Sequence, residues 1–282
     1  MSWALVLVAP PDELELLASD LFELGALGVE LQEPGMPLMP GTPHLPEGRG
    51  RAIAHFDERS DADQAARALH AEPPVEIAAQ DWSVAWRAHH RTMKVGPRSW
   101  VVPPWEQKPA GVVVTIDPGM AFGTGSHPTT SLCLEACDEL LAARPGADLL
   151  DVGTGSGVIA LLAVKLGAGR VVGTENDPVA LDVARAGAEL NGIASDRIEW
   201  LLQNPADVPG TFGIVIANIL LNTLEELAQQ IAAKVARGGR LVLSGLLAAQ
   251  GDAAEHAYVS QGLRAVSRKE RDGWIRVELE RP

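Results

Sequence analysis

A short glycine loop between an apolar strand and a helix is the feature that most constrains the fold of this chain. Residues 149–167 read LLDVGTGSGVIALLAVKLG: an apolar run reaches Asp151, three glycines follow at alternate positions, and a helical pattern begins at once. Glycine lets the backbone turn sharply and approach a ligand closely. Because ligands of open parallel sheets bind beyond the carboxyl ends of the strands, Gly153, Gly155 and Gly157 predict a ligand site after this strand.

Strand-like and helical segments alternate from residue 112 onward. The apolar runs are 112–116, 147–152, 170–175, 213–218 and 240–245, and the helical patterns lie near 128–142, 156–167, 178–191, 222–236 and 247–261. This alternation predicts an α/β fold with a Rossmann-like parallel sheet. Residues 263–269 and 274–280, joined by a turn with Asp272-Gly273, predict a closing antiparallel hairpin.

The first 80 residues predict a separate small domain. Strand-like runs at 3–8, 28–33, 51–56 and 75–79 are interleaved with helical patterns at 11–24 and 60–71. This order, β-α-β-β-α-β, is that of an α+β ferredoxin-like unit. We therefore expect a ferredoxin-like domain over 1–80, an inter-domain linker over 81–105 and an α/β domain over 106–282.

Two segments at the edges of this plan have unusual compositions. Residues 34–50 are crowded with proline and glycine, which predicts a loop or flexible insertion. The expected linker holds four of the seven tryptophans: Trp82, Trp86, Trp100 and Trp105. These rings either form a contact surface between domains or pack against the domain that they cover, and packing is the more common role.

Composition limits the class of protein. A length of 282 residues suits two domains, and a net charge of −14 opposes nucleic-acid binding. The acidity either attracts a basic partner or aids solubility.

The N-terminus lacks the basic region of a signal peptide, and no apolar run approaches membrane-spanning length. Cys133 and Cys137 come without a metal-ligand cluster, so we expect buried thiols, no metal and a cytoplasmic protein.

The ligand is indicated by the spacing of the glycines and by the next strand. The GxGxG spacing departs from the GxGxxG fingerprint of NAD-binding loops and resembles motif I of class I S-adenosylmethionine (SAM) methyltransferases. Glu175 ends the following strand, where a carboxylate accepts hydrogen bonds from ribose hydroxyls. Asp177 competes for that role, but Asp177 before Pro178 is a good helix start. We assign Asp177 to helix capping and Glu175 to the ribose.

Asn218 is the candidate catalytic residue. It ends the apolar run 213–218, at the same carboxyl edge as the glycine loop. Its carbonyl oxygen there is able to hold an amino group that receives a methyl. A polar residue that merely stops the strand is the competing explanation. Together with the glycine loop and Glu175, the catalytic interpretation is favoured.

Residues 115–135, TIDPGMAFGTGSHPTTSLCLE, are more specific than the glycine loop. They resemble the signature of the ribosomal protein L11 methyltransferase family. DWSVAWRAHH, SWVVPPW, VVGTENDP and ANIL resemble the same family, so the likeness extends over roughly residues 81–282. The first 80 residues resemble the family in the order of their predicted elements more than in amino-acid sequence.

The resemblance implies a fold and an activity. It implies a substrate-capturing ferredoxin-like domain joined by a linker to a class I SAM methyltransferase domain. The implied reaction is methylation of lysine side-chain amines and of the N-terminal α-amino group of ribosomal protein L11, with SAM as cofactor. The implied cofactor contacts are Thr130, Gly153, Glu175 and Asn218. The loop 117–127 would close over the cofactor, with Phe122 either shielding it or packing in the core.

Some features depart from the family pattern. Glu175 stands where aspartate is more usual, Thr154 replaces the commoner cysteine, and the 34–50 insertion is longer than expected. His127 either takes part in catalysis or shapes the loop before Pro128.

Three alternative functions remain. They are a class I methyltransferase that acts on another protein or on a small-molecule amine, an NAD-dependent oxidoreductase, and a non-catalytic SAM-binding protein. The two-domain plan suits a monomer, which we expect.

Overall fold

The computed structural model describes residues 2–32, 49–77, 91–117 and 127–282. They form two compact units, Met1–His89 and His90–Pro282. The predicted loop 34–50 lies almost wholly outside the described residues, as do Trp82, Trp86 and Phe122. In the described part of the chain, no helix is long and apolar enough to cross a membrane.

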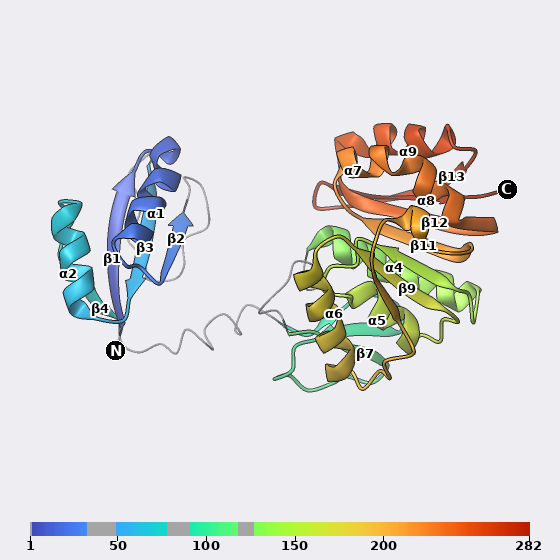
Figure 1. Ribbon diagram of the computed structural model, residues 1–282, viewed down its shortest axis with the longest axis horizontal. Helices are drawn as coiled ribbons and strands as arrows, with labels where there is room; N and C mark the ends of the chain where they lie inside the picture. The colour runs from blue at the N-terminus through green and yellow to red at the C-terminus, as the bar shows by residue number, and fades with distance from the viewer. Residues whose placement is uncertain (1, 33–48, 78–90, 118–126) are drawn as a thin grey trace. The chain divides into compact units, whose positions relative to one another are not determined.

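The first unit has the predicted α+β layout. Its elements are β1 (Ser2–Ala9), a 3-10 turn (Pro11–Glu13), α1 (Leu14–Glu23), β2 (Gly28–Gln32), β3 (Gly50–Phe56), α2 (Arg59–Ala68) and β4 (Val75–Ile77). The antiparallel sheet has the order β2-β3-β1-β4, with Trp3 opposite Phe56. Leu5, Leu21 and Phe56 are completely or almost completely buried in its core. Helices α1 and α2 pack against this sheet (Figure 1).

The second unit contains the predicted parallel sheet. Its strands are β8 (Leu149–Val152), β9 (Val171–Glu175), β10 (Glu199–Leu202), β11 (Phe212–Asn218), β12 (Val235–Leu247), β13 (Arg264–Arg271) and β14 (Trp274–Glu280). Their order is β10-β9-β8-β11-β12-β14-β13; β8 to β12 run parallel, while β14 pairs antiparallel with β12 and β13. The parallel sheet and the closing hairpin are confirmed. Strand β10 was not predicted.

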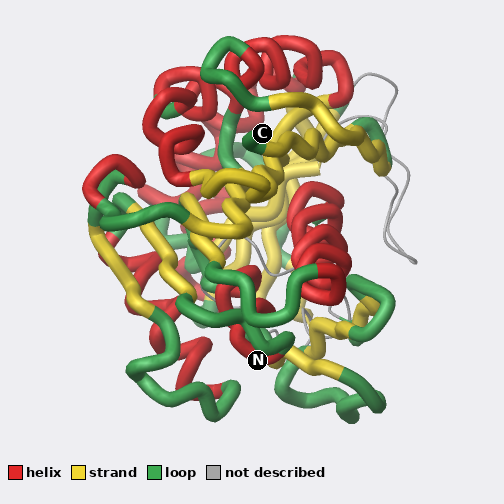
Figure 2. Tube along the Cα trace, turned by 90° about the vertical axis from the view of Figure 1, so that its right-hand side faces the viewer, coloured by secondary structure: helices red, strands yellow, loops and turns green. Residues whose placement is uncertain are grey.

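Helices cover both faces of this sheet, as Figure 2 shows from a second direction. One apolar core involves α4 (Pro128–Ala143), α5 (Val158–Lys165) and α6 (Pro178–Leu190). The other involves α7 (Leu221–Glu226), α8 (Ala228–Lys234) and α9 (Gly251–Val259). Strands buried on both faces explain why residues 149–152 and 214–217 are apolar almost without interruption.

Two helices differ from their predicted ranges. The single helix expected over 222–236 is two short helices, α7 and α8, on either side of Leu227, and the chain is already in β12 from Val235. The helix expected over 247–261 is α9, preceded by a 3-10 turn at Ala248–Gln250. The sequence pattern predicted helical structure in both ranges, but it does not show where the backbone changes direction.

The strand predicted at 112–116 does not join the main sheet. It forms β7 (Val112–Thr115), which pairs parallel with β6 (Ser99–Val102), and β6 pairs antiparallel with β5 (Met93–Lys94). Residues 93–102 fall within the range expected as a linker, yet here they belong to a small sheet of the second unit. Asp138 of α4 attaches this sheet: its carboxylate accepts hydrogen bonds from the Arg98 backbone and guanidinium and from the Ser99 hydroxyl.

Cys133 and Cys137 are fully buried free thiols on α4. Burial raises the pKa of Cys133 to about 12 and the pKa of Cys137 well above its ordinary value. Since a thiolate is the reactive form of cysteine, both side chains act as small apolar core residues.

Candidate active site

A cavity of about 630 Å³ lies at the carboxyl edge of the parallel strands. Volumes of this size are typical of small-molecule sites. The strand order reverses between β8 and β11, and such a switch point is where open α/β sheets bind ligands. All five predicted site residues line this one cavity: Thr130, Gly153, Gly155, Glu175 and Asn218.

The glycine loop has the backbone shape that only glycine adopts easily. Gly153, Gly155 and Gly157 have φ of 68°, 52° and 79°. A Cβ added to Gly153 would lie 2.5 Å from Cγ2 of Ile219, in the turn after β11. The absence of side chains therefore lets the loops after β8 and β11 approach each other at the floor of the cavity.

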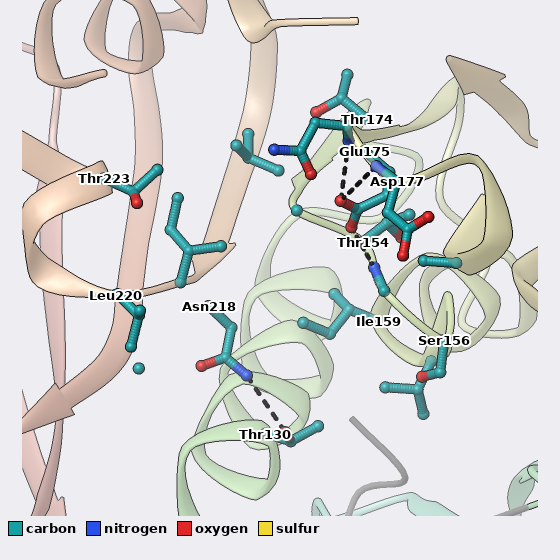
Figure 3. Close-up of a pocket in the computed structure, with 18 of the residues that line it drawn as sticks. Thr130, Thr154, Ser156, Ile159, Thr174, Glu175, Asp177, Asn218, Leu220 and Thr223 are labelled. Atoms are coloured by element: carbon teal, nitrogen blue, oxygen red, sulfur yellow. Dashed lines mark hydrogen bonds between the residues drawn. The ribbon is translucent and has the colours of Figure 1, made fainter. Parts of the chain in front are cut away.

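Glu175 at the end of β9 holds the glycine loop in place. Its Oε2 accepts a hydrogen bond from the Gly155 backbone N–H at 3.0 Å, and its Oε1 accepts from the Asn176 backbone N–H at 2.8 Å (Figure 3). Oε1 also accepts from the Asp177 backbone N–H at 3.3 Å. Because an ionised carboxylate has about four acceptor positions, two on each oxygen, Oε2 keeps capacity for a hydroxyl group of a ligand.

Asp177 caps α6, as the sequence predicted. Its side chain accepts a hydrogen bond from the Val179 backbone N–H at 2.9 Å, and Pro178 occupies the first helical position. Asp177 also lines the cavity. Its carboxylate is nonetheless bonded to the N-terminus of α6.

Asn218 is joined to α4 by a hydrogen bond. Its Nδ2 donates to Oγ1 of Thr130 at 3.2 Å, although 88 positions separate the two residues. This bond orients the carboxamide, and Figure 3 shows the carbonyl oxygen on the other branch of the side chain, turned away from Thr130. Asn218 therefore presents a hydrogen-bond acceptor to the end of the cavity that lies away from Glu175.

His127 caps α4. Its ring contacts the Thr129 hydroxyl at 2.8 Å through Nδ1 and meets the edge of Trp274 with the ring centroids 4.6 Å apart. This local role agrees with the expectation that His127 shapes the segment before Pro128. Most of the predicted closing loop, residues 118–126, lies outside the described residues.

Asp151 lies directly before the loop, fully buried. Burial raises the pKa of its carboxyl to about 7, while hydrogen bonds from the Thr154 side chain and the Ala160 backbone oppose that rise and the charge of Glu175 adds to it. The Thr154 hydroxyl donates to Oδ2 of Asp151 at 2.6 Å. This hydrogen bond between Asp151 and Thr154 links the end of β8 to the glycine loop.

Several residues that line the cavity were not predicted. Gln203 and Asn204 follow β10, and polar residues after an apolar EWLL segment were a usable signal for them. Trp274 comes from the start of β14. Nothing in its local sequence indicated the cavity, because only the pairing of β14 with β12 brings it there. Among residues 2–32, 49–77, 91–117 and 127–282, no cluster of three metal-ligating side chains occurs.

Comparison with known proteins gives consistent matches over the whole chain. Residues 2–282 match the family model described as "Ribosomal protein L11 methyltransferase (PrmA)". A protein of that name from Myxococcus xanthus is 43% identical over 287 residues, covering 99% of this chain and 98% of its own. Another from Azotobacter vinelandii is 40% identical over 298 residues, covering 99% of each.

A solved structure supports the same match. The ribosomal protein L11 methylase of Lactobacillus delbrueckii subsp. bulgaricus superposes with a TM-score of 0.61 at 29% identity, covering 68% of this chain and 98% of that one. The predicted fold class is confirmed by this likeness and by the sheet order.

Proposed function

Because the chain belongs to the ribosomal protein L11 methyltransferase family, we propose that it methylates ribosomal protein L11, with SAM as the methyl donor. The observation that carries the proposal is the single cavity that joins Glu175 and the glycine loop at one end with Asn218 at the other. The acceptors are lysine side-chain amines and the N-terminal α-amino group of the substrate.

The residues of the cavity fit SAM. The glycine loop lines the cavity directly after β8, where its glycines lack Cβ atoms and let the backbone approach a ligand closely. Glu175 offers an acceptor position on Oε2 for a ribose hydroxyl. Thr130 and Asn218 lie at the end where the methyl group and the amine must meet. When bound, SAM supplies an activated methyl group on a sulfonium centre.

The protein's own task is alignment and exclusion of water. The incoming amine must be neutral, and deprotonating a free lysine at pH 7 costs roughly 4.6 kcal/mol, from a pKa of about 10.4. Desolvation in a closed site lowers that pKa. Asn218, fixed by Thr130, accepts a hydrogen bond from the amine through Oδ1 and directs its lone pair toward the methyl group.

The remaining parts of the chain take further roles in this proposal. The ferredoxin-like unit binds the protein substrate, with its boundary near residue 80 and the linker after it. The enzyme acts as a monomer in the cytoplasm, where its substrate is made. The acidic net charge of −14 complements a basic protein substrate.

A methyl-transfer assay tests the proposal. Labelled SAM is incubated with dissociated, unmethylated ribosomal proteins, and the labelled band is analysed by mass spectrometry. We expect label on L11 at lysines and the amino terminus. SAM binding without any labelled ribosomal protein would overturn the substrate, and binding of NAD instead of SAM would overturn the cofactor.

Variants of Asn218 test its role. We expect Asn218→Ala to lower turnover by about 100-fold with SAM affinity nearly unchanged, because the lost contact is made to the amine. Asn222→Ala is a matched control, since Asn222 is an exposed asparagine on α7 and outside the cavity lining. Equal losses of turnover and SAM affinity in Asn218→Ala would refute the role.

A further inference from the structure

The tip of the β13–β14 hairpin forms part of the wall at the amine end of the cavity. Trp274 lines the cavity and meets the ring of His127 edge-on, at an interplanar angle of 72°. Across the Asp272-Gly273 turn, Trp274 pairs with Arg271 as the last residue pair of the hairpin. The position of the indole therefore depends on how the tip of the hairpin is held.

Arg271 attaches this tip to α4. Its Nη1 donates to Oγ of Ser131 at 2.5 Å and its Nη2 to Oε2 of Glu135 at 3.2 Å. Lys269 adds a second contact, from Nζ to Oε1 of Glu135, at 2.7 Å. Ser131 and Glu135 lie four positions apart on one face of the helix. Glu135 is 19% exposed and Arg271 37%, so water screens the pair less than a fully exposed one.

Helix α4, to which Arg271 is hydrogen-bonded, also positions other residues that line the amine end of the cavity. His127 caps it, Thr130 in its first turn receives the hydrogen bond of Asn218, and Ser131 is the next residue. Two walls from distant parts of the chain thus meet at the His127–Trp274 contact. Lys269 and Arg276 of the hairpin also bond to α4, but Arg271 is the residue that pairs directly with Trp274 and bonds to Ser131.

We propose that Arg271 is a positioning residue for methyl transfer: by joining the hairpin tip to the first turns of α4, it sets the spacing of Trp274, His127 and Asn218 around the incoming amine. The proposal rests on the proposed function for the nature of the acceptor. We call the contacts of Arg271 with Ser131 and Glu135 the clamp. Loss of the clamp leaves Gly155 and Glu175 unchanged, since neither makes a hydrogen bond to the hairpin in the described part of the chain.

The chain offers a matched control on the same strand. Arg268 of β13 is 38% exposed and makes two ion pairs, with Asp252 and Glu255 of α9. It therefore resembles Arg271 in strand, exposure and number of partners, but it grips a different helix, and none of these three residues lines the cavity. A purely structural contribution of a hairpin arginine should appear in both variants.

The experiment compares Arg271→Met with Arg268→Met in the full chain. Methyl transfer to L11 gives kcat and KM, SAM titration gives Kd, and thermal unfolding gives Tm. We expect kcat to fall roughly tenfold in Arg271→Met and less than twofold in Arg268→Met, with similar Tm and with SAM Kd within twofold of the wild type. Arg271→Lys, which retains the pair with Glu135, should recover part of the loss.

Equal losses of kcat in the two variants would overturn the proposal, and so would a loss confined to SAM Kd. If Arg271→Met fails to fold, Glu135→Gln and Arg271→Lys serve in its place. A second readout does not depend on L11: the imidazole NMR signal of His127, which senses the Trp274 ring, should move in Arg271→Met and stay in Arg268→Met. An unmoved signal refutes the clamp, whereas an inactive wild-type enzyme refutes only the proposed function.

Discussion

Replacing Asp151 with asparagine tests what the buried carboxyl below the glycine loop does to stability. Asp151 is fully buried, and burial raises its pKa from an ordinary 3.8 to about 7. Between these values the folded protein keeps a proton that the unfolded chain has released. The stability that this group contributes is therefore fully present below about pH 4 and is lost as the pH rises to about 7.

The pKa difference fixes the size of the effect. A tenfold change in proton affinity is worth about 1.4 kcal/mol, so the whole change amounts to roughly 4 kcal/mol. Between about pH 5 and pH 8 the wild-type chain should lose about 3 kcal/mol through Asp151. Asparagine is neutral throughout and still accepts the Thr154 hydrogen bond, so Asp151→Asn should gain about 3 kcal/mol relative to the wild type over this range and be the more stable at pH 8.

Urea unfolding of both proteins at several pH values, at constant ionic strength and without cofactor, measures this difference. Asp182→Asn is the control, because its carboxylate on α6 is 79% exposed and its removal should leave the wild-type pH dependence intact. A stability difference between Asp151→Asn and the wild type that stays constant within about 0.5 kcal/mol from pH 5 to pH 8 would refute the reasoning.

Three further changes have expected outcomes. Gly153→Ala should weaken SAM binding at least tenfold in a titration, because the new Cβ meets Ile219 at a φ of 68°; unchanged affinity would show that the loop adapts. Asp177→Ala should lower the free energy of unfolding by about 1 kcal/mol through loss of the helix cap, with calorimetry as the check. Tyr258→Phe should cost about 1 kcal/mol, because the buried hydroxyl donates to the Leu224 carbonyl at 3.0 Å; a neutral substitution in urea unfolding contradicts this.

The local features of this protein were readable from the chain because each depends on neighbours in the sequence. The apolar runs that became β8, β9 and β11, the left-handed glycines after β8 and the Asp177-Pro178 helix start are all of this kind. Their shared edge follows from the rule for parallel strands, so the sequence alone predicts that Glu175 and Asn218 lie in one site.

Other features are decided only when distant segments pack. Strand β7 has the same apolar character as the central strands, but it pairs with β6 in a small sheet of its own. Trp274 faces His127, and Thr130 holds Asn218, through contacts that span more than 80 positions in each case.

The pKa of Asp151 belongs to this second group, because it is set by the completed core around the side chain. Sequence patterns indicate which residues are favourable to bury and which turns the backbone can adopt. The energy of a long-range contact or a buried charge depends instead on the whole arrangement of neighbours, which exists only in the folded chain.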